Sequence, residues 1–186
     1  MRLAISNIAW DVEEDEQVAA LLQRYAVDAI DIAPGKYFAN PPEATRVEIL
    51  AVKQWWENRG AEITGMQSLL FGTTGLNMFG GAESQAAVLA HLGAICRIGG
   101  VLGATKLVFG SPKNRDRSGL DDREAHDRGV AFFRRLADIA AGEGVIVCLE
   151  PNPPCYGANF MTTSAETARV VEACGHPAIR MQLDSG

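Results

Sequence analysis

The chain has 186 residues, of which 47% are hydrophobic and 22% charged, and its formal net charge is −6. This composition is typical of one globular domain with a substantial core and excludes a disordered or low-complexity chain. The acidic balance argues against a general affinity for nucleic acid or for anionic membranes, because both require a basic surface.

Strand-like and helical segments alternate through the first part of the chain. Short apolar runs predict strands, and the segments between them carry apolar residues at helical spacing. Gly60 follows the second helical segment, where glycine commonly ends a helix. The predicted order is a strand at 2–9, a helix at 14–26, a strand at 27–34, a helix at 43–60 and a strand at 62–72.

The same alternation continues to the end of the chain. Ser84 is the expected N-cap of the third helix. The fourth helix begins with Asp121 and Asp122 and ends near Gly144, as the helix dipole and the C-terminal preference for glycine favour. The predicted order is a helix at 84–103, a strand at 105–112, a helix at 121–144, a strand at 145–151, a helix at 164–175 and a strand at 178–184.

Repeated strand–helix units predict an α/β protein with a parallel sheet. The runs KLVF and VIVCL are apolar on both faces, which is typical of parallel strands covered by helices. A doubly wound open sheet and a (β/α)8 TIM barrel both fit. No GxGxxG or GxxxxGK[ST] motif follows a strand, so the barrel is favoured. A barrel needs eight strands and about 250 residues. We therefore expect residues 1–186 to form a single TIM-barrel domain with only about six βα units, its C-terminal part missing.

Two of the predicted strands end on a carboxylate. Glu150 follows VIVCL, and Asp184 follows IRMQL. Ligands of parallel α/β proteins bind at the C-terminal ends of the strands, where both side chains are expected. Two carboxylates on neighbouring strands repel each other unless a cation lies between them, and hard oxygen ligands suit a divalent metal ion. An acid that caps a helix or forms a salt bridge is the alternative at each position.

The sequence around these carboxylates resembles the xylose-isomerase-like TIM barrels, the sugar phosphate isomerase/epimerase family. A strand ends in LEP with an Asn next, a loop leads to a TTS helix start, and a further strand ends in LD. The resemblance runs over essentially the whole chain. It implies that Glu150 and Asp184 bind one divalent metal ion (Mn, Mg, Co or Zn), and that the other two ligands, a His and a Glu, would lie beyond Gly186.

The resemblance also implies an activity. It is that of a divalent-metal-dependent sugar or sugar-phosphate isomerase or epimerase, which acts by proton transfer through an enediolate, with Glu150 as one acid/base. A related keto-inositol-type dehydratase and a truncated, non-catalytic ligand-binding domain are alternatives. An abasic-site endonuclease is disfavoured, because that activity needs further histidines at the ends of strands three and four. Those ends read Gln67-Ser68 and Phe109-Gly110-Ser111.

Two features depart from the family pattern. The loop at 151–160, PNPPCYGANF, differs from the usual epimerase loop, which leaves the substrate open. Many epimerases also carry a substrate-contacting His a few residues after the strand-six Asp; here only Ser185 and Gly186 follow Asp184, so this element cannot be compared.

The loop at 110–119 is basic within an acidic protein. Its Lys113 and Arg115 are candidates for binding a phosphate or carboxylate of the substrate. The alternative is a solvated loop whose arginines pair with nearby aspartates.

Other candidate substrate-binding residues lie near the predicted strand ends. Asn152 and Gln67 are candidates for hydrogen bonds to a sugar, and Trp10, Tyr37 and Phe109 for an apolar wall against its ring. Turn formation and core packing are the alternatives.

The expected partner is therefore a small sugar or sugar phosphate, with no nucleic acid and no membrane, and pairing into a homodimer is left open. The N-terminus lacks the pattern of a signal peptide, and no unbroken apolar stretch approaches the ~20 residues of a membrane span. The cysteines form no CxxC pair and are read as reduced thiols. These features predict a cytoplasmic protein.

Overall fold

The computed structural model describes residues 2–184. Its sheet has six strands in the order β1-β2-β3-β4-β5-β6, and each strand is parallel to its neighbours. The strands are β1 Ala4–Ser6, β2 Ala29–Ile32, β3 Glu62–Met66, β4 Lys106–Phe109, β5 Ile146–Leu149 and β6 Ile179–Met181. The α-helices are α1 Asp15–Arg24, α2 Arg46–Glu57, α3 Ala82–Leu102, α4 Asp122–Gly142 and α5 Ser164–Cys174.

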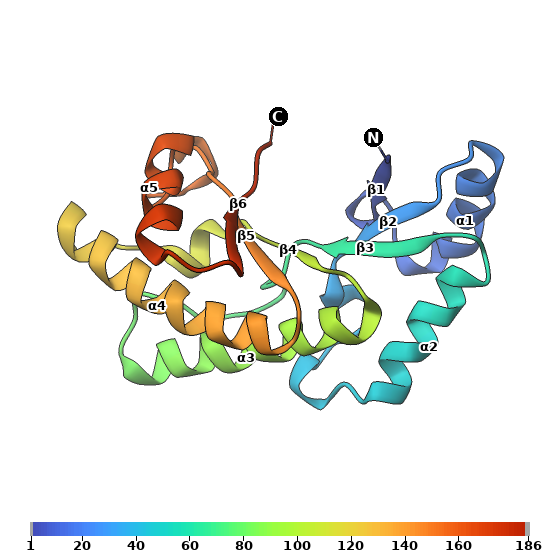
Figure 1. The fold of residues 1–186 in the computed structure, drawn as a ribbon, viewed down its shortest axis with the longest axis horizontal. Helices are drawn as coiled ribbons and strands as arrows, with labels where there is room; N and C mark the ends of the chain where they lie inside the picture. Colours follow the sequence, from blue (N-terminus) through green and yellow to red (C-terminus); the bar gives the residue numbers. More distant parts are fainter. Residues whose placement is uncertain (1, 185–186) are drawn as a thin grey trace.

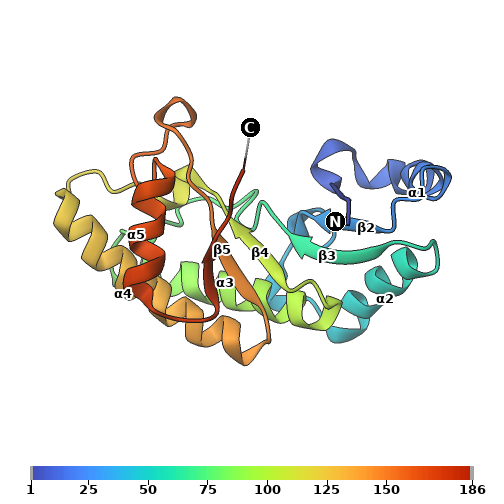
Figure 2. The same cartoon turned by 45° about the horizontal axis from the view of Figure 1, so that its top comes forward.

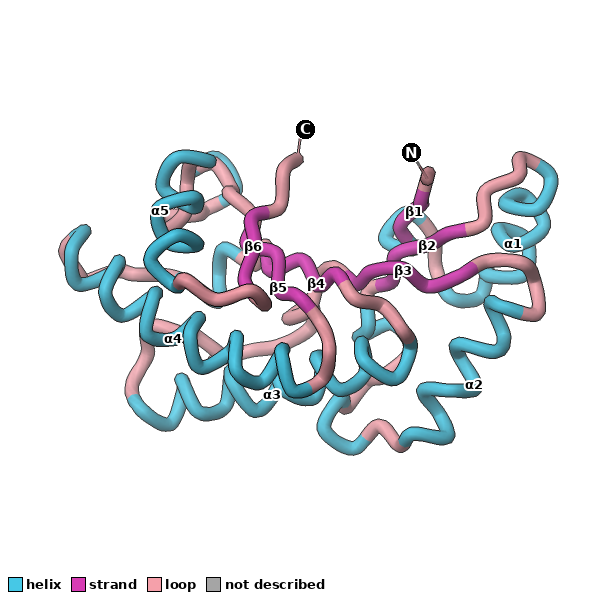
Figure 3. The backbone as a smooth tube through the Cα atoms, in the orientation of Figure 1, coloured by secondary structure: helices cyan, strands magenta, loops and turns pink. Residues whose placement is uncertain are grey.

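The sheet curves like part of a barrel wall, with the helices along its outer, convex side (Figures 1 and 2). β1 and β6 are the two edges, and a gap separates them on the concave side (Figure 3). Strands that follow one another in sequence and pair in parallel need such helical crossovers. The predicted α/β fold with about six βα units is confirmed.

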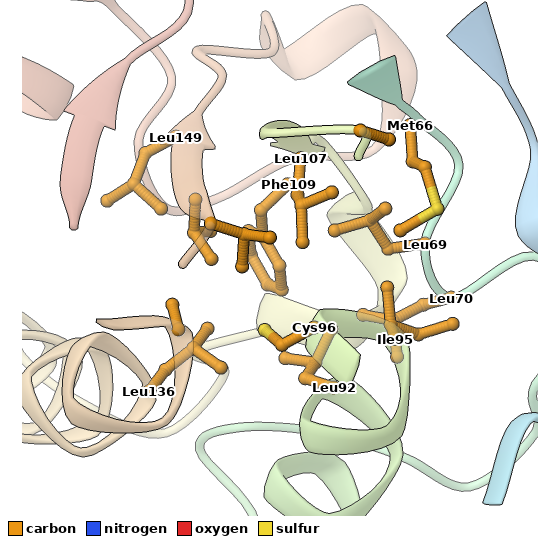
Figure 4. Packing of buried hydrophobic residues seen from close by; sticks show 14 of the residues in the cluster. Met66, Leu69, Leu70, Leu92, Ile95, Cys96, Leu107, Phe109, Leu136 and Leu149 are labelled. Carbon is orange, nitrogen blue, oxygen red and sulfur yellow. The ribbon is translucent and has the colours of Figure 1, made fainter. Parts of the chain in front are cut away.

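The main core lies between the middle strands and the helices α3 and α4 (Figure 4). Leu107, Phe109 and Leu149 point from β4 and β5 toward this layer and are at most 1% exposed. The ring of Phe109 packs edge-on against Phe133 of α4, with 5.4 Å between centroids. Because side chains alternate along a strand, the residue after Leu149 points to the concave side of the sheet. That residue is Glu150.

Within residues 2–184, one helix, α3, is long and apolar enough by length and composition to cross a membrane, with a mean hydropathy of 1.5 over its most apolar window. Half of that window is buried inside the protein. The buried side chains, among them Leu92, Ile95 and Cys96, form part of the core against the sheet (Figure 4). We therefore interpret α3 as a core helix.

Several boundaries differ from the predicted ones. β1 ends at Ser6 because its hydroxyl accepts a hydrogen bond from Ile8 N at 3.2 Å and begins a 3-10 turn at Asn7–Ala9. The extended part of β3 ends before Ser68, which has a positive φ of 54°. The prediction that Ser84 caps α3 is wrong: the helix begins at Ala82, and the Ser84 hydroxyl bonds both Asn77 O and Asn77 N.

Candidate functional site

Glu150 directly follows the last residue of β5, and its carboxylate lies over Gly110, which directly follows the neighbouring strand β4. The Glu150 backbone N–H donates to Phe109 O at 3.0 Å, which continues the pairing of β4 and β5 by one residue. A Cβ atom added to Gly110 would lie 2.0 Å from Glu150 Oε2. Only glycine therefore leaves room for the Glu150 carboxylate in this position.

Asn152 and Arg115 hold Glu150 from the other side. Asn152 Nδ2 donates to Glu150 Oε2 at 2.9 Å. Arg115 Nη1 donates to the backbone oxygen of Glu150 at 2.8 Å, and its Nη2 donates to Asn152 Oδ1. The guanidinium thus orients the amide, and the amide orients the carboxylate. Among residues 2–184, Glu150 Oε1 has no hydrogen-bond partner, so one carboxylate oxygen remains available.

Arg115 lies inside the protein rather than on a basic surface. Its side chain is 0% exposed, and burial lowers the pKa of the guanidinium to about 10, although the carboxylates of Glu150 and Glu166 act in the opposite direction. Its Nε has no partner within the described chain. The interpretation of Arg115 as a group that captures a substrate anion needs correction, because no ligand reaches a side chain with no accessible surface.

The rest of the basic loop is fixed by polar contacts with neighbouring loops. Asn114 is buried, and its Nδ2 donates to Leu76 O at 2.8 Å. Arg117 Nη1 pairs with Asp122 at 2.6 Å, as the alternative interpretation of this loop expected. Lys113 is exposed and makes no ion pair with a described residue. Of the two cations named as anion-binding candidates, only Lys113 is accessible.

Asp184 lies beyond the end of β6, the strand that pairs with β5. Leu149 pairs with Met181, and Gln182 N donates to Leu149 O at 2.8 Å, so the chain continues beside β5 for at least one residue after β6. Asp184 is exposed. Ser185 and Gly186, on which the comparison with the family's substrate-binding His depends, lie outside the described residues.

Glu150 and Asp184 are of the residue type that binds a divalent metal ion. Both provide hard oxygen ligands at the C-terminal ends of neighbouring parallel strands, as Mg²⁺ or Mn²⁺ prefers. No group of three or more His, Cys, Asp or Glu side chains suited to a metal ion occurs in the described part of the chain. The described residues therefore supply two candidate ligands, fewer than a complete site requires.

The candidates for the apolar wall are mostly buried. Trp10 is 9% exposed, packs in the core and donates from Nε1 to Asp15 at 2.7 Å. Phe109 is 1% exposed and faces the helices. Their burial agrees with the alternative of core packing stated for these residues. Gln67 is half-buried at the end of β3, and its backbone N–H donates to Ile32 O at 3.0 Å.

Gly110 is the site residue that the sequence analysis missed. The usable signal was its position: a glycine comes directly after an apolar strand, level with a carboxylate on the next strand. The inward direction of Arg115 has no comparable signal, because its sequence neighbours are all polar.

Several solved structures have the same fold. D-psicose 3-epimerase from Clostridium cellulolyticum H10, crystallised with D-tagatose, is similar with a TM-score of 0.75 and 16% identity over 97% of this chain and 62% of that one. A zinc-bound IOLI protein is similar with a TM-score of 0.72 and 15% identity, over 100% of this chain and 63% of that one. A probable 3-DHS dehydratase, AsbF from Bacillus anthracis, is similar with a TM-score of 0.69 and 12% identity, over 99% of this chain and 63% of that one. The chain thus spans about 62% of the length of these proteins.

A comparison with curated proteins gives no match. The sequence profile of the family described as "Xylose isomerase-like TIM barrel" matches residues 19–186, which is most of the chain. The parallel strand order and the helices on the convex side agree with that match. The chain therefore belongs to the xylose isomerase-like TIM barrel family.

Proposed function

We propose that this protein is a divalent-metal-dependent sugar or sugar-phosphate isomerase or epimerase in which Glu150 moves the proton. The observation that carries the proposal is the fixed Glu150 carboxylate, held at the end of β5 by Asn152 over Gly110. A general base needs a defined position relative to the carbon it deprotonates, and this arrangement provides one.

In this proposal Glu150 removes the proton from the carbon next to a ketose carbonyl, which leaves an enediolate. Return of the proton by Glu150 to the neighbouring carbon gives an isomer, whereas an epimer requires a second acid/base that protonates the other face. Asn152 keeps Oε2 in place through its amide, and Arg115 keeps the amide oriented.

Glu150 and Asp184 would hold the metal ion. The chemistry that a bound divalent ion supplies is polarisation of the carbonyl and the adjacent hydroxyl, which makes the neighbouring C–H more acidic. Exposed Lys113 is the residue that we assign to a phosphate on the substrate.

The similar structures support an isomerase or epimerase, since they include an epimerase crystallised with a ketose and a zinc-bound protein. One similar structure is a probable dehydratase, but no contact described here favours loss of water over return of the proton. We place the protein in the cytoplasm, where a soluble sugar substrate would be found.

The test is hydrogen exchange in D2O, with protein expressed from its native gene, Mn²⁺ and a panel of ketoses. We expect deuterium to enter the carbon next to the carbonyl, and Glu150→Gln to slow this by at least about 100-fold. The matched control is Glu172→Gln, at an exposed carboxylate on α5. Exchange at the wild-type rate in Glu150→Gln would overturn the proposal, and a dehydrated product would reassign the reaction.

A further inference from the structure

A cavity of about 410 Å³ lies far along the sheet from Glu150, between the turn that follows β1 and the end of helix α2. The turn is a 3-10 helix at Val12–Glu14, and α2 contributes Trp55 and Trp56. The helices α1 and α2 stand at the β1–β3 end of the sheet, whereas β5 is near the other end (Figures 1 and 2). This volume lies within the range of small-molecule sites.

The cavity wall is aromatic and aliphatic. Tyr37, Trp55 and Trp56 line it, and Val12 and Val52 add apolar surface. The rings of Trp55 and Trp56 pack edge-on, with 4.8 Å between centroids, and are therefore held in fixed orientations. Trp56 is 0% exposed and supports the wall from behind, whereas Trp55 is partly exposed and presents an aromatic surface of the kind that attracts a cation.

The charged groups at this cavity are mainly carboxylates. Asp15 is only 6% exposed, and its two oxygens accept hydrogen bonds from neutral donors, Trp10 Nε1 and Tyr37 OH, each at 2.7 Å. No cation of the described chain lies within salt-bridge distance of Asp15. Glu13 is exposed and has no ion-pair partner among residues 2–184. Both carboxylates border the same cavity.

The guanidinium of Arg59 already lies over the ring of Trp55 at this cavity. Its Cζ lies 3.7 Å from the ring centroid of Trp55, and its Nη2 pairs with Glu16 at 2.7 Å. This contact combines an aromatic face with a carboxylate, and the same two kinds of group line the rest of the cavity. Asp15 and Glu13 remain without such a cation.

We propose that this cavity binds a small organic cation, an alkylammonium group of about the size of choline. The aromatic and aliphatic walls would cover its methyl groups, while Asp15 and Glu13 would balance its charge. An anion would meet uncompensated carboxylates, and a neutral molecule of the same shape would gain only the apolar contact. The site would therefore bind a ligand of positive charge, whereas Lys113 is assigned to a negatively charged phosphate. The proposal does not depend on the proposed reaction.

The chain carries its own reporter of binding, because all three of its tryptophans are here: Trp10 and Trp56 also pack edge-on, with centroids 6.3 Å apart. The experiment follows the three indole N–H signals of ¹⁵N-labelled protein during titration with choline chloride, against sodium chloride at the same ionic strength. The comparison ligand is 3,3-dimethyl-1-butanol, which has the shape of choline without its charge. We expect choline to shift the Trp55 and Trp56 signals with a Kd of about 1–10 mM, and the neutral alcohol to bind roughly 5- to 30-fold more weakly.

Two variants test the assigned groups. Trp55→Leu should weaken choline binding by roughly 5- to 30-fold, followed at the Trp56 signal, and Glu13→Gln by up to about 5-fold. Glu43→Gln, which removes an exposed carboxylate outside the cavity, should leave the affinity unchanged. The dispersion of the remaining indole signals shows whether a variant is folded.

Three results would overturn the proposal: no shift with choline, equal affinity for choline and the neutral alcohol, or unchanged choline affinity in both folded variants. None of these readouts depends on catalytic activity, so failure of this proposal and failure of the proposed isomerase or epimerase function can be told apart.

Discussion

Replacing Gly110 by alanine would place a methyl group against the carboxylate of Glu150. The added Cβ would lie 2.0 Å from Glu150 Oε2 and 3.0 Å from its Cδ, whereas real Cβ atoms essentially never approach another heavy atom more closely than 3.0 Å. The oxygen must therefore move by at least about 1 Å. Gly110 does not have a positive φ, so the backbone itself accepts alanine.

The expected effect is large on activity and small on stability. Oε2 is the atom that accepts the hydrogen bond from Asn152, so its displacement costs about 1 kcal/mol. The lower entropy of the unfolded chain with alanine offsets about 0.4–1 kcal/mol of this. A displacement of about 1 Å at a catalytic group costs about 100-fold in rate. We therefore expect deuterium exchange to fall about 100-fold while Tm changes by less than about 4 °C.

The matched control is Gly93→Ala in α3, where the added Cβ would meet Ile139 at an ordinary distance of 3.6 Å. It should keep full activity and gain about 0.5–1 kcal/mol of stability, because alanine replaces glycine inside a helix. Full activity in Gly110→Ala would refute the reasoning that the position of this carboxylate matters. A loss of Tm by more than about 10 °C would show instead that the carboxylate cannot move aside.

Three further predictions concern packing and surface groups. Arg115→Met removes the donors to Asn152 Oδ1 and to the Glu150 backbone oxygen. Because the loss of a buried charge offsets part of this cost, we expect the free energy of unfolding in urea to fall by about 2–4 kcal/mol. A variant as stable as the wild type would contradict these contacts. Of the four cysteines only Cys155 is exposed. A thiol reagent at pH 8 should therefore modify one thiol rapidly in the native protein and none in Cys155→Ser. Rapid reaction of a second thiol would be inconsistent with the burial of the other three cysteines. Thr45→Ala breaks the capping box with Glu48 at the start of α2 and should cost about 1 kcal/mol by thermal unfolding. The Thr45 backbone N–H, and then its hydroxyl, hold the pKa of Glu48 below its usual value, so the contribution of Glu48 to this box should persist below the usual carboxyl pKa and be lost as the pH falls through the lowered one.

The sequence by itself determined the order and type of all eleven strands and helices. Apolar runs such as KLVF and VIVCL lie in the sheet, and the segments between them form the helices on its convex side. The spacing of apolar residues along the sequence predicts these elements, because each helix must bury one apolar face against the strands next to it. The ends were less predictable: β1 stops at Ser6 and α3 starts before Ser84, since a single side-chain hydrogen bond decides such a boundary.

The position of Glu150 at a strand end was also determined by the sequence, through the apolar run before it. The tertiary structure alone decided the direction of the side chains around it. Arg115 turns inward because Asn152 and the Glu150 backbone offer it acceptors from a segment 35 to 37 residues away, and Gly110 leaves room from the neighbouring strand. Trp10 turns into the core because Asp15 and Trp56 meet it there. Contacts of this kind join segments that only folding brings together, so they leave no periodic pattern in the sequence.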